Sequence, residues 1–233
     1  MTEPIPFAHR GGTDGGHPEN SLAAFADALA RGAALETDVR LSSDGIPVLV
    51  HDAHFPRGGV PYPVRATRAA TLARHGVPSL ADLYQVLGTR YEVSIDVKSR
   101  AAARPAIDVA RDAGARSTLW LVHDDLATLG ELRVYDTEVR LVHEARPPSG
   151  GDVVATADAR ARELVTRGIN TENRHWGSWT RAQVDAMHAR DVLAFGSLVH
   201  RAGELADAAS RGLDALYSDH VDALVAALSG SGA

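Results

Sequence analysis

Residues 5–39 read IPFAHRGGTDGGHPENSLAAFADALARGAALETDV, and the order of patterns in this stretch indicates the fold. A short apolar run, Ile5–His9, precedes a stretch with the period of a helix, Asn20–Arg31. A second apolar run, Leu35–Val39, follows directly. This is the pattern of a strand, a covering helix and a second, parallel strand.

The same alternation continues to the end of the chain. Further strands are expected at Val48–His51, Val93–Val97, Thr118–Val122, Val139–Val142, Gly168–Thr171, Val192–Phe195 and Ala215–Tyr217. About eight strand–helix units favour a closed barrel over an open doubly wound sheet. We therefore predict one TIM (β/α)8 barrel domain over residues 1–233, of class α/β. We also expect a short loop insertion after the second strand region, at Ala53–Val77, and a disordered tail at 229–233.

The composition narrows the classes of function. The net charge of −6 argues against nucleic acid as a partner, because binding to a phosphate backbone needs a basic surface. The chain contains no cysteine, which excludes disulfides and cysteine metal sites. Neither a signal peptide nor a transmembrane run of about 18 apolar residues is recognisable. We expect a cytoplasmic protein that acts on a small molecule, without an obligate protein partner.

Ionisable side chains stand at the carboxyl ends of the expected strands, which form the working face of such a barrel. Glu36 and Asp38 lie two residues apart, as do Asp96 and Lys98, so each pair points to one face of its strand. Carboxylates held this close repel one another unless a cation lies between them, and Mg²⁺ and Ca²⁺ prefer carboxylate oxygens. Spacing alone leaves a second interpretation open, since a strand-end Asp more often caps a turn or a helix.

Two histidines at strand ends suggest proton transfer. An ordinary histidine side chain exchanges protons near neutral pH, so one of His9 and His51 could take a proton from the attacking group and the other could protonate the leaving oxygen. Arg10 and Lys98 could bind phosphate oxygens. With a divalent cation, these residue types favour cleavage of a phosphodiester. For each histidine, a purely local hydrogen bond remains the alternative, and Asp52 is expected to orient its neighbour or cap a turn.

Several short motifs follow one another in the N-terminal part of the chain. They are HRGG at 9–12, PENS at 18–21, ETDV at 36–39, DGIPV at 44–48 and HD at 51–52. A weaker series continues through Ile95–Lys98 and ends with Gly212–Asp219. Together the motifs resemble those of the glycerophosphodiester phosphodiesterase family.

The resemblance implies hydrolysis of glycerophosphodiesters to glycerol 3-phosphate and an alcohol, with one divalent cation, Mg²⁺, Ca²⁺ or Mn²⁺. Carried over by position, the acid–base pair is His9 and His51. The residues that match the metal ligands are Glu36, Asp38 and Asp96. Those that match contacts to the substrate phosphate are Arg10 and Lys98.

Three departures and two alternatives accompany the resemblance. Asp96 stands where the family usually has Glu, the link Gly32–Glu36 is one residue short, and Phe195–Leu198 replaces a Trp-Thr-Val-Asn segment. The Asp-x-Lys pattern also resembles the sphingomyelinase D-like phospholipases, which would act on lysophospholipid or sphingomyelin headgroups. A barrel that binds phosphodiesters without cleaving them is the second alternative. His123, His143 and Glu172 have the location of rim residues, but no partner is evident in the sequence.

Overall fold

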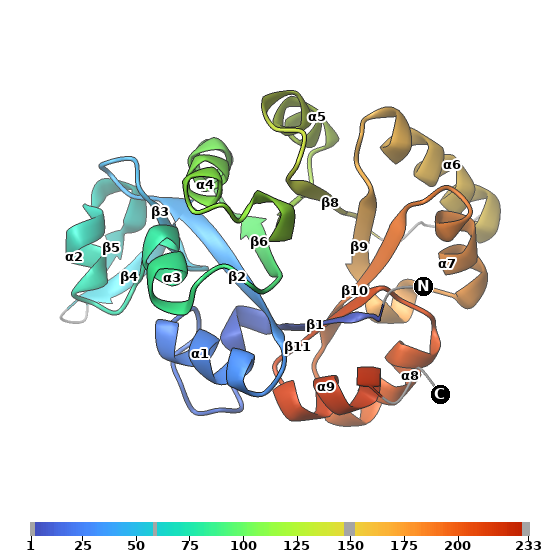
Figure 1. Ribbon diagram of the computed structural model, residues 1–233, viewed down its shortest axis with the longest axis horizontal. Helices are drawn as coiled ribbons and strands as arrows, with labels where there is room; N and C mark the ends of the chain where they lie inside the picture. Colours follow the sequence, from blue (N-terminus) through green and yellow to red (C-terminus); the bar gives the residue numbers. More distant parts are fainter. Residues whose placement is uncertain (1–2, 58–59, 147–151, 230–233) are drawn as a thin grey trace.

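Eight parallel strands close into a ring in the computed structural model, which describes residues 3–57, 60–146 and 152–229 (Figure 1). In ring order they are β1 (Ile5–Ala8), β2 (Ala34–Leu41), β6 (Val93–Val97), β7 (Leu119–His123), β8 (Arg140–Glu144), β9 (Thr171–His175), β10 (Leu193–Val199) and β11 (Ala215–Ser218). The ring is closed because β1 pairs with both β11 and β2. The predicted (β/α)8 barrel is confirmed.

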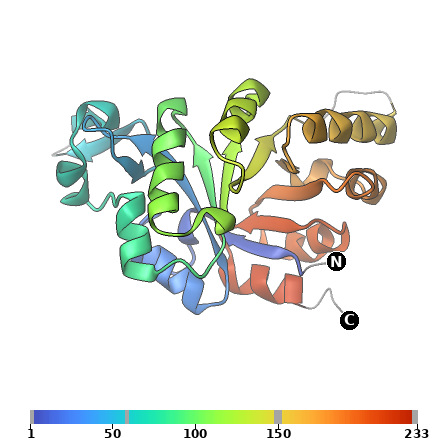
Figure 2. The ribbon, with the colours of Figure 1, turned by 45° about the horizontal axis from the view of Figure 1, so that its top comes forward.

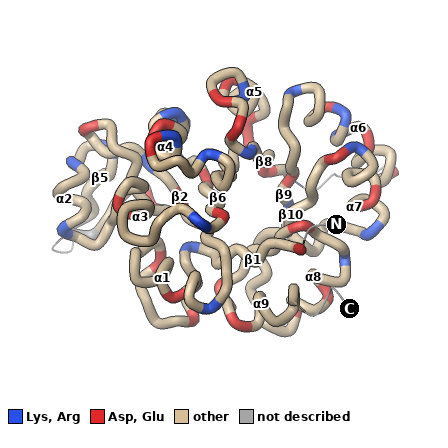
Figure 3. The backbone as a smooth tube through the Cα atoms, in the orientation of Figure 1, with Lys and Arg blue, Asp and Glu red and all other residues tan. Residues whose placement is uncertain are grey.

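Helices cover the outside of the ring (Figure 2). They are α1 (Leu22–Ala30), α3 (Leu80–Leu87), α4 (Arg100–Asp112), α5 (Leu126–Tyr135), α6 (Val153–Thr166), α7 (Arg181–His188), α8 (Leu205–Ser210) and α9 (Val221–Ser229). Within the described ranges no helix has the length and apolarity needed to cross a membrane. Lys and Arg positions are interspersed with Asp and Glu positions all around the ring (Figure 3).

Short 3₁₀ turns complete the connections, and they are η1 (His9–Gly11), η2 (Val64–Ala66), η3 (Arg116–Thr118), η4 (Trp176–Ser178) and η5 (Ala202–Glu204). Helix starts follow the expected capping chemistry. Ser79, for example, accepts a hydrogen bond from the backbone N–H of Asp82, whose carboxylate accepts one from the N–H of Ser79. Such reciprocal caps satisfy amide groups that have no partner within the helix.

The segment after β2 differs from the sequence prediction. Val48–His51 was expected in the barrel, but β3 (Pro47–Leu49) pairs antiparallel with β2 and forms a hairpin. The predicted loop, Ala53–Val77, instead holds a two-stranded sheet and a helix, namely β4 (His54–Arg57), β5 (Val60–Pro63) and α2 (Ala69–Ala73). This insertion folds because Phe55 and Leu72 pack in a small apolar cluster of its own.

The start of β9 and the end of α9 also differ from the sequence prediction. The strand expected at Gly168–Thr171 begins only at Thr171, so polar residues follow inside β9. In the tail, Ser229 is the last residue of α9, and residues 230–233 lie outside the described part of the chain.

Aromatic and aliphatic side chains fill the lower part of the barrel interior. The cluster contains Phe7, Trp120, Val122, Val142, Phe195, Ala215 and Tyr217. The rings of Phe7 and Tyr217 stack with their centroids 5.0 Å apart, and the Tyr217 hydroxyl lies 3.0 Å from Oγ of Ser94. The interior is therefore a packed plug, above which only the carboxyl ends of the strands are open.

A buried carboxylate ties the end of α5 to the neighbouring α4 region. The Asp136 side chain is 1% exposed and accepts hydrogen bonds from Arg111 (2.9 Å) and Arg116 (3.3 Å). It also accepts bonds from the backbone N–H groups of Glu138 and Val139. Burial alone would raise the pKa of Asp136, but these donors outweigh it and lower the pKa to about 2.

Replacement of Asp136 by asparagine should lower the free energy of unfolding by an amount that depends on pH. A lowered folded-state pKa stabilises the fold above the unfolded pKa of about 4, and this contribution disappears as the pH falls towards 2. Asp136→Asn should therefore lower the free energy of unfolding by about 2 to 3 kcal/mol at neutral pH, and by only a few tenths of a kcal/mol at about pH 2. Urea unfolding of both proteins at the two pH values measures this. If the difference in unfolding free energy between the two proteins were the same at both pH values, the lowered pKa of Asp136 would be contradicted.

Candidate active site

A cavity of about 380 Å³ opens at the carboxyl ends of the strands, above the plug. The structure brings together in its walls all seven residues singled out from the sequence, namely His9, Arg10, Glu36, Asp38, His51, Asp96 and Lys98. The remaining lining residues are Ser94, Val122, Glu144, Asn173, Ser197 and Tyr217.

The sharp turn after β1 depends on the HRGG motif. Arg10, Gly11 and Gly12 all have positive φ, at 51°, 88° and 77°. A Cβ atom on Gly11 would lie 2.8 Å from that of Ala24 in α1, and one on Gly12 would lie 2.4 Å from Cγ2 of Val221 in α9. Only glycine allows both helices to approach this closely, so the motif positions the first residues of the cavity.

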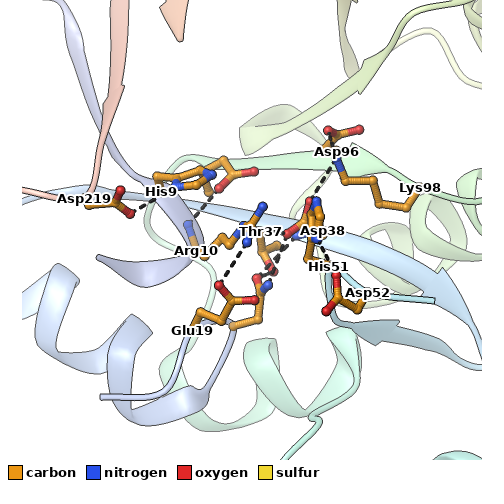
Figure 4. A network of polar contacts seen from close by, with 12 residues as sticks. His9, Arg10, Glu19, Thr37, Asp38, His51, Asp52, Asp96, Lys98 and Asp219 are labelled. Atoms are coloured by element: carbon orange, nitrogen blue, oxygen red, sulfur yellow. Dashed lines mark hydrogen bonds and ion pairs between the residues drawn. The ribbon is translucent and has the colours of Figure 1, made fainter. Parts of the chain in front are cut away.

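The PENS motif supports the same wall (Figure 4). Glu19 accepts a hydrogen bond from Nη1 of Arg10 at 2.9 Å. Nδ2 of Asn20 donates to Oδ2 of Asp38 at 3.1 Å, while its Oδ1 accepts from Oγ1 of Thr37 at 2.6 Å. The motif therefore orients an arginine and a carboxylate in the cavity. From the sequence alone, the motif was evident only as a point of resemblance to the family.

Three carboxylates and two cations share one side of the cavity. Asp38 in β2 lies opposite Asp96 in β6, and Glu36 precedes them on the same face of β2. Burial, and then the charge of Asp38, raises the pKa of Glu36 above its usual range. Nζ of Lys98 lies 2.5 Å from Oδ2 of Asp96 and 3.3 Å from Oδ1 of Asp38. Nε of Arg10 lies 3.3 Å from the other oxygen of Asp38.

These carboxylates fit a hard divalent cation by their chemistry. Within residues 3–57, 60–146 and 152–229, no three acidic or histidine side chains already converge as a set of metal ligands. The ammonium of Lys98 spans two of the three carboxylates instead. The donors are all carboxylate oxygens, which is the ligand type that Mg²⁺ and Ca²⁺ prefer.

Each cavity histidine is oriented by an aspartate (Figure 4). Nδ1 of His9 lies 3.0 Å from Oδ1 of Asp219, at the end of β11, and Nδ1 of His51 lies 2.8 Å from Oδ1 of Asp52. The second ring nitrogen, Nε2, is then the one available to a ligand. Burial lowers the pKa of His9, but the hydrogen bond to Asp219 and the charge of Glu36 outweigh it, so this pKa lies above its ordinary value.

The β2–β3 hairpin carries His51 back to the mouth of the barrel. The N–H of Val50 donates to the carbonyl oxygen of Asp38 at 2.9 Å, and Nε of Arg40 donates to that of His51 at 2.8 Å. His51, two residues beyond the end of β3, thus reaches the cavity although β3 is not part of the barrel ring.

Glu144 and Asn173 are cavity residues that the sequence analysis did not single out. Glu144 ends β8, a strand-end position that could have indicated it, and burial raises its pKa to about 7. Asn173 gave no signal, because β9 was expected to end before it. His123 lies at the end of β7, where its Nδ1 accepts a hydrogen bond from the N–H of Asp125 at 2.9 Å.

His143 and Glu172, which the sequence placed at the expected rim of the barrel, do not lie there. His143 and Glu172 are buried, and their Nδ1 and Oε2 atoms lie 3.4 Å apart. Glu172 also pairs with Arg174 and with Arg160 of α6, so this group faces the helices rather than the cavity. His143 and Glu172 are therefore partners of one another, which the sequence did not reveal.

Comparison with known sequences identifies the family to which this chain is similar. Residues 9–223 match the Glycerophosphoryl diester phosphodiesterase family. The "Probable glycerophosphodiester phosphodiesterase 2" of Mycobacterium tuberculosis is 36% identical over 125 residues, which are 50% of this chain and 47% of that protein. Human glycerophosphodiester phosphodiesterase 1 is 54% identical over 47 residues, 20% of this chain and 14% of that protein. The matches therefore span about half or less of these relatives.

Solved structures share the fold. A glycerophosphodiester phosphodiesterase from Thermotoga maritima superposes with a TM-score of 0.79 at 20% identity, covering 97% of this chain and 99% of that chain. An Oleispira antarctica phosphodiesterase in complex with the product sn-glycerol-3-phosphate gives 0.81 at 21% identity, with 97% of both chains covered. Since the family match spans most of its length, the chain belongs to the glycerophosphoryl diester phosphodiesterase family.

Proposed function

We propose that this protein hydrolyses glycerophosphodiesters to glycerol 3-phosphate and an alcohol, using one divalent cation and two histidines. The observation that carries the proposal is the single cavity that holds His9, His51 and Arg10 together with the carboxylate cluster and Lys98. The family match supports the reaction class, and so does the structural relative that binds sn-glycerol-3-phosphate.

The charged side of the cavity would bind the phosphodiester. Glu36, Asp38 and Asp96 would hold the cation, which supplies positive charge to the phosphoryl oxygens when bound. Arg10 offers a planar guanidinium and Lys98 a point charge, and both can donate to non-bridging oxygens. Because both also contact Asp38, they are held at the cavity before substrate arrives.

The two histidines would move protons on either side of the phosphorus atom. One accepts the proton of the attacking hydroxyl, and the other donates a proton to the leaving oxygen. Asp219 and Asp52 hold the two rings through Nδ1, so Nε2 is the nitrogen that exchanges the proton. The attacking group is either water or the glycerol hydroxyl of the substrate, and only the second route forms a cyclic phosphate.

Loss of either histidine should abolish most turnover. His9→Ala and His51→Ala should each lower kcat for glycerophosphocholine by about two to four powers of ten, the range for acid–base groups. His54→Ala is the matched control, since His54 is exposed in β4 and does not line the cavity. Release of glycerol 3-phosphate is measured after chelation and separate addition of Mg²⁺, Ca²⁺ and Mn²⁺.

Lysophospholipid and sphingomyelin provide the comparison substrates in the same assay. The proposed substrate class is wrong if the wild-type protein releases no glycerol 3-phosphate with any of the three cations. The histidine assignment fails if both variants turn over as fast as the His54→Ala control.

Removal of the aspartate behind His9 should shift the pH profile. Asp219 raises the pKa of His9, so Asp219→Asn should lower this pKa. Whether His9 acts as acid or base, the limb of the kcat/KM profile that reports it moves to lower pH. The profile of the variant is compared with that of Asp52→Asn, because Asp52 contacts the other histidine, His51. An unchanged limb in Asp219→Asn would contradict the role of this hydrogen bond.

A further inference from the structure

His51 enters the cavity from outside the barrel ring, so the pairing of the ring strands does not fix its position. It follows β3, which pairs with one edge of β2, whereas β6 pairs with the other edge (Figure 1). The ring of His51 bonds to Asp52, but Asp52 is the next residue of the same loop and its side chain is 75% exposed. This bond orients the ring without attaching it to the barrel.

The side chain of Arg40 supplies the attachment. Its Nε donates to the carbonyl oxygen of His51 at 2.8 Å. Within residues 3–57, 60–146 and 152–229, this is the only hydrogen bond that joins His51 itself to a barrel strand. The preceding residue, Val50, bonds to Asp38 through its own amide, so Arg40 extends the anchored stretch by one residue to the histidine.

The same guanidinium also reaches the strand on the other edge of β2. Its Nη1 lies 3.5 Å from the carbonyl oxygen of Lys98, which directly follows β6. Arg40 lies two residues after Asp38 in β2 and therefore shares its face of the strand. A planar guanidinium offers donors in two directions, whereas an ammonium is a single point charge. Arg40 can thus hold the backbones of His51 and Lys98 in a fixed relation to β2.

The charge of Arg40 also acts on the partner of the histidine ring. The hydrogen bond with His51 lowers the pKa of Asp52, and the positive charge of Arg40 acts in the same direction. An ionised Asp52 accepts from Nδ1 of His51 and leaves Nε2 available for proton transfer. Contact and charge therefore support the same histidine.

We infer that Arg40 is a positioning residue for the reaction, which holds the acid–base residue His51 at a fixed place relative to the phosphate contact Lys98. Arg40 is not among the residues that line the cavity, so it acts through these two residues and not on the substrate. This inference rests on the proposed function. A displacement of about 1 Å can lower a rate about a hundredfold, so loss of Arg40 should affect kcat more than substrate binding.

Turnover of single and double variants tests whether Arg40 acts through His51. Arg40→Met removes the donors and keeps much of the length of the side chain. It should lower kcat for glycerophosphocholine by about ten- to a hundredfold and change KM by less than about threefold. In the His51→Ala background, the same change should lower kcat by less than about threefold, because the histidine that Arg40 positions is then absent.

Arg68→Met is the matched control and should keep the wild-type kcat. Arg68 lies 3.6 Å from Asp44, in the turn of the same β2–β3 hairpin, and its side chain is 74% exposed. In Arg40→Lys, which keeps the charge and a donor, kcat should fall by only about three- to tenfold. This variant carries the same comparison if Arg40→Met does not fold.

Backbone dynamics test the same contact without turnover. In the wild-type protein, the NMR order parameter of the His51 amide should be that of a rigid backbone, about 0.85, and in Arg40→Met it should fall towards about 0.6. The amide of Val50 should stay rigid in both proteins, because its bond to Asp38 does not involve Arg40.

The inference is overturned if the order parameter of the His51 amide is the same in both proteins, whatever their turnover. It is also overturned if Arg40→Met keeps the wild-type kcat, or if it lowers kcat as much in the His51→Ala background as in the wild-type protein. A wild-type protein that releases no glycerol 3-phosphate with any cation, but whose His51 amide loses order in Arg40→Met, would overturn the proposed function alone.

Discussion

Repulsion among three carboxylates at one barrel mouth is the constraint around which the rest of the site is arranged. Glu36, Asp38 and Asp96 line one cavity, and burial of Glu36 beside Asp38 makes its ionised form costly. In the protein alone, Arg10 and Lys98 compensate Asp38 from both sides. Like charges in a partly desolvated site need a nearby cation, and in the proposed function a divalent cation would add to these two side chains.

The barrel produces this density of charge through its geometry. Parallel strands end at the same face, so residues far apart in the chain, such as His9 and Asp219, come within 3.0 Å. The aromatic plug closes the interior below them, and the charged groups therefore collect in a shallow space instead of spreading through the core. In the proposed function, the phosphate would bind beside the charged residues that line this space near β1, β2 and β6.

Much of this arrangement could be predicted from the sequence, and the exceptions have physical causes. Strand–helix alternation and two-residue spacing were sufficient for the barrel and for the meeting of Glu36 with Asp38. The hairpin that carries His51 was missed because an antiparallel strand has the same local pattern as a parallel one. Asn173 was missed because β9, Thr171–His175, is polar, and its burial depends on ion pairs such as Glu172 with Arg174 that form only in the fold.

Cation binding by the chelated protein, followed through the midpoint of thermal unfolding, tests the central claim most directly. A cation that binds only the folded state should raise stability by about 2.7 kcal/mol at a hundred times its Kd, and the midpoint should rise accordingly. Glu36→Gln and Asp96→Asn should remove most of this rise, whereas Glu144→Gln, at a cavity carboxylate at the end of β8, should keep it. No rise with Mg²⁺, Ca²⁺ or Mn²⁺, or an equal rise in all four proteins, would contradict the account.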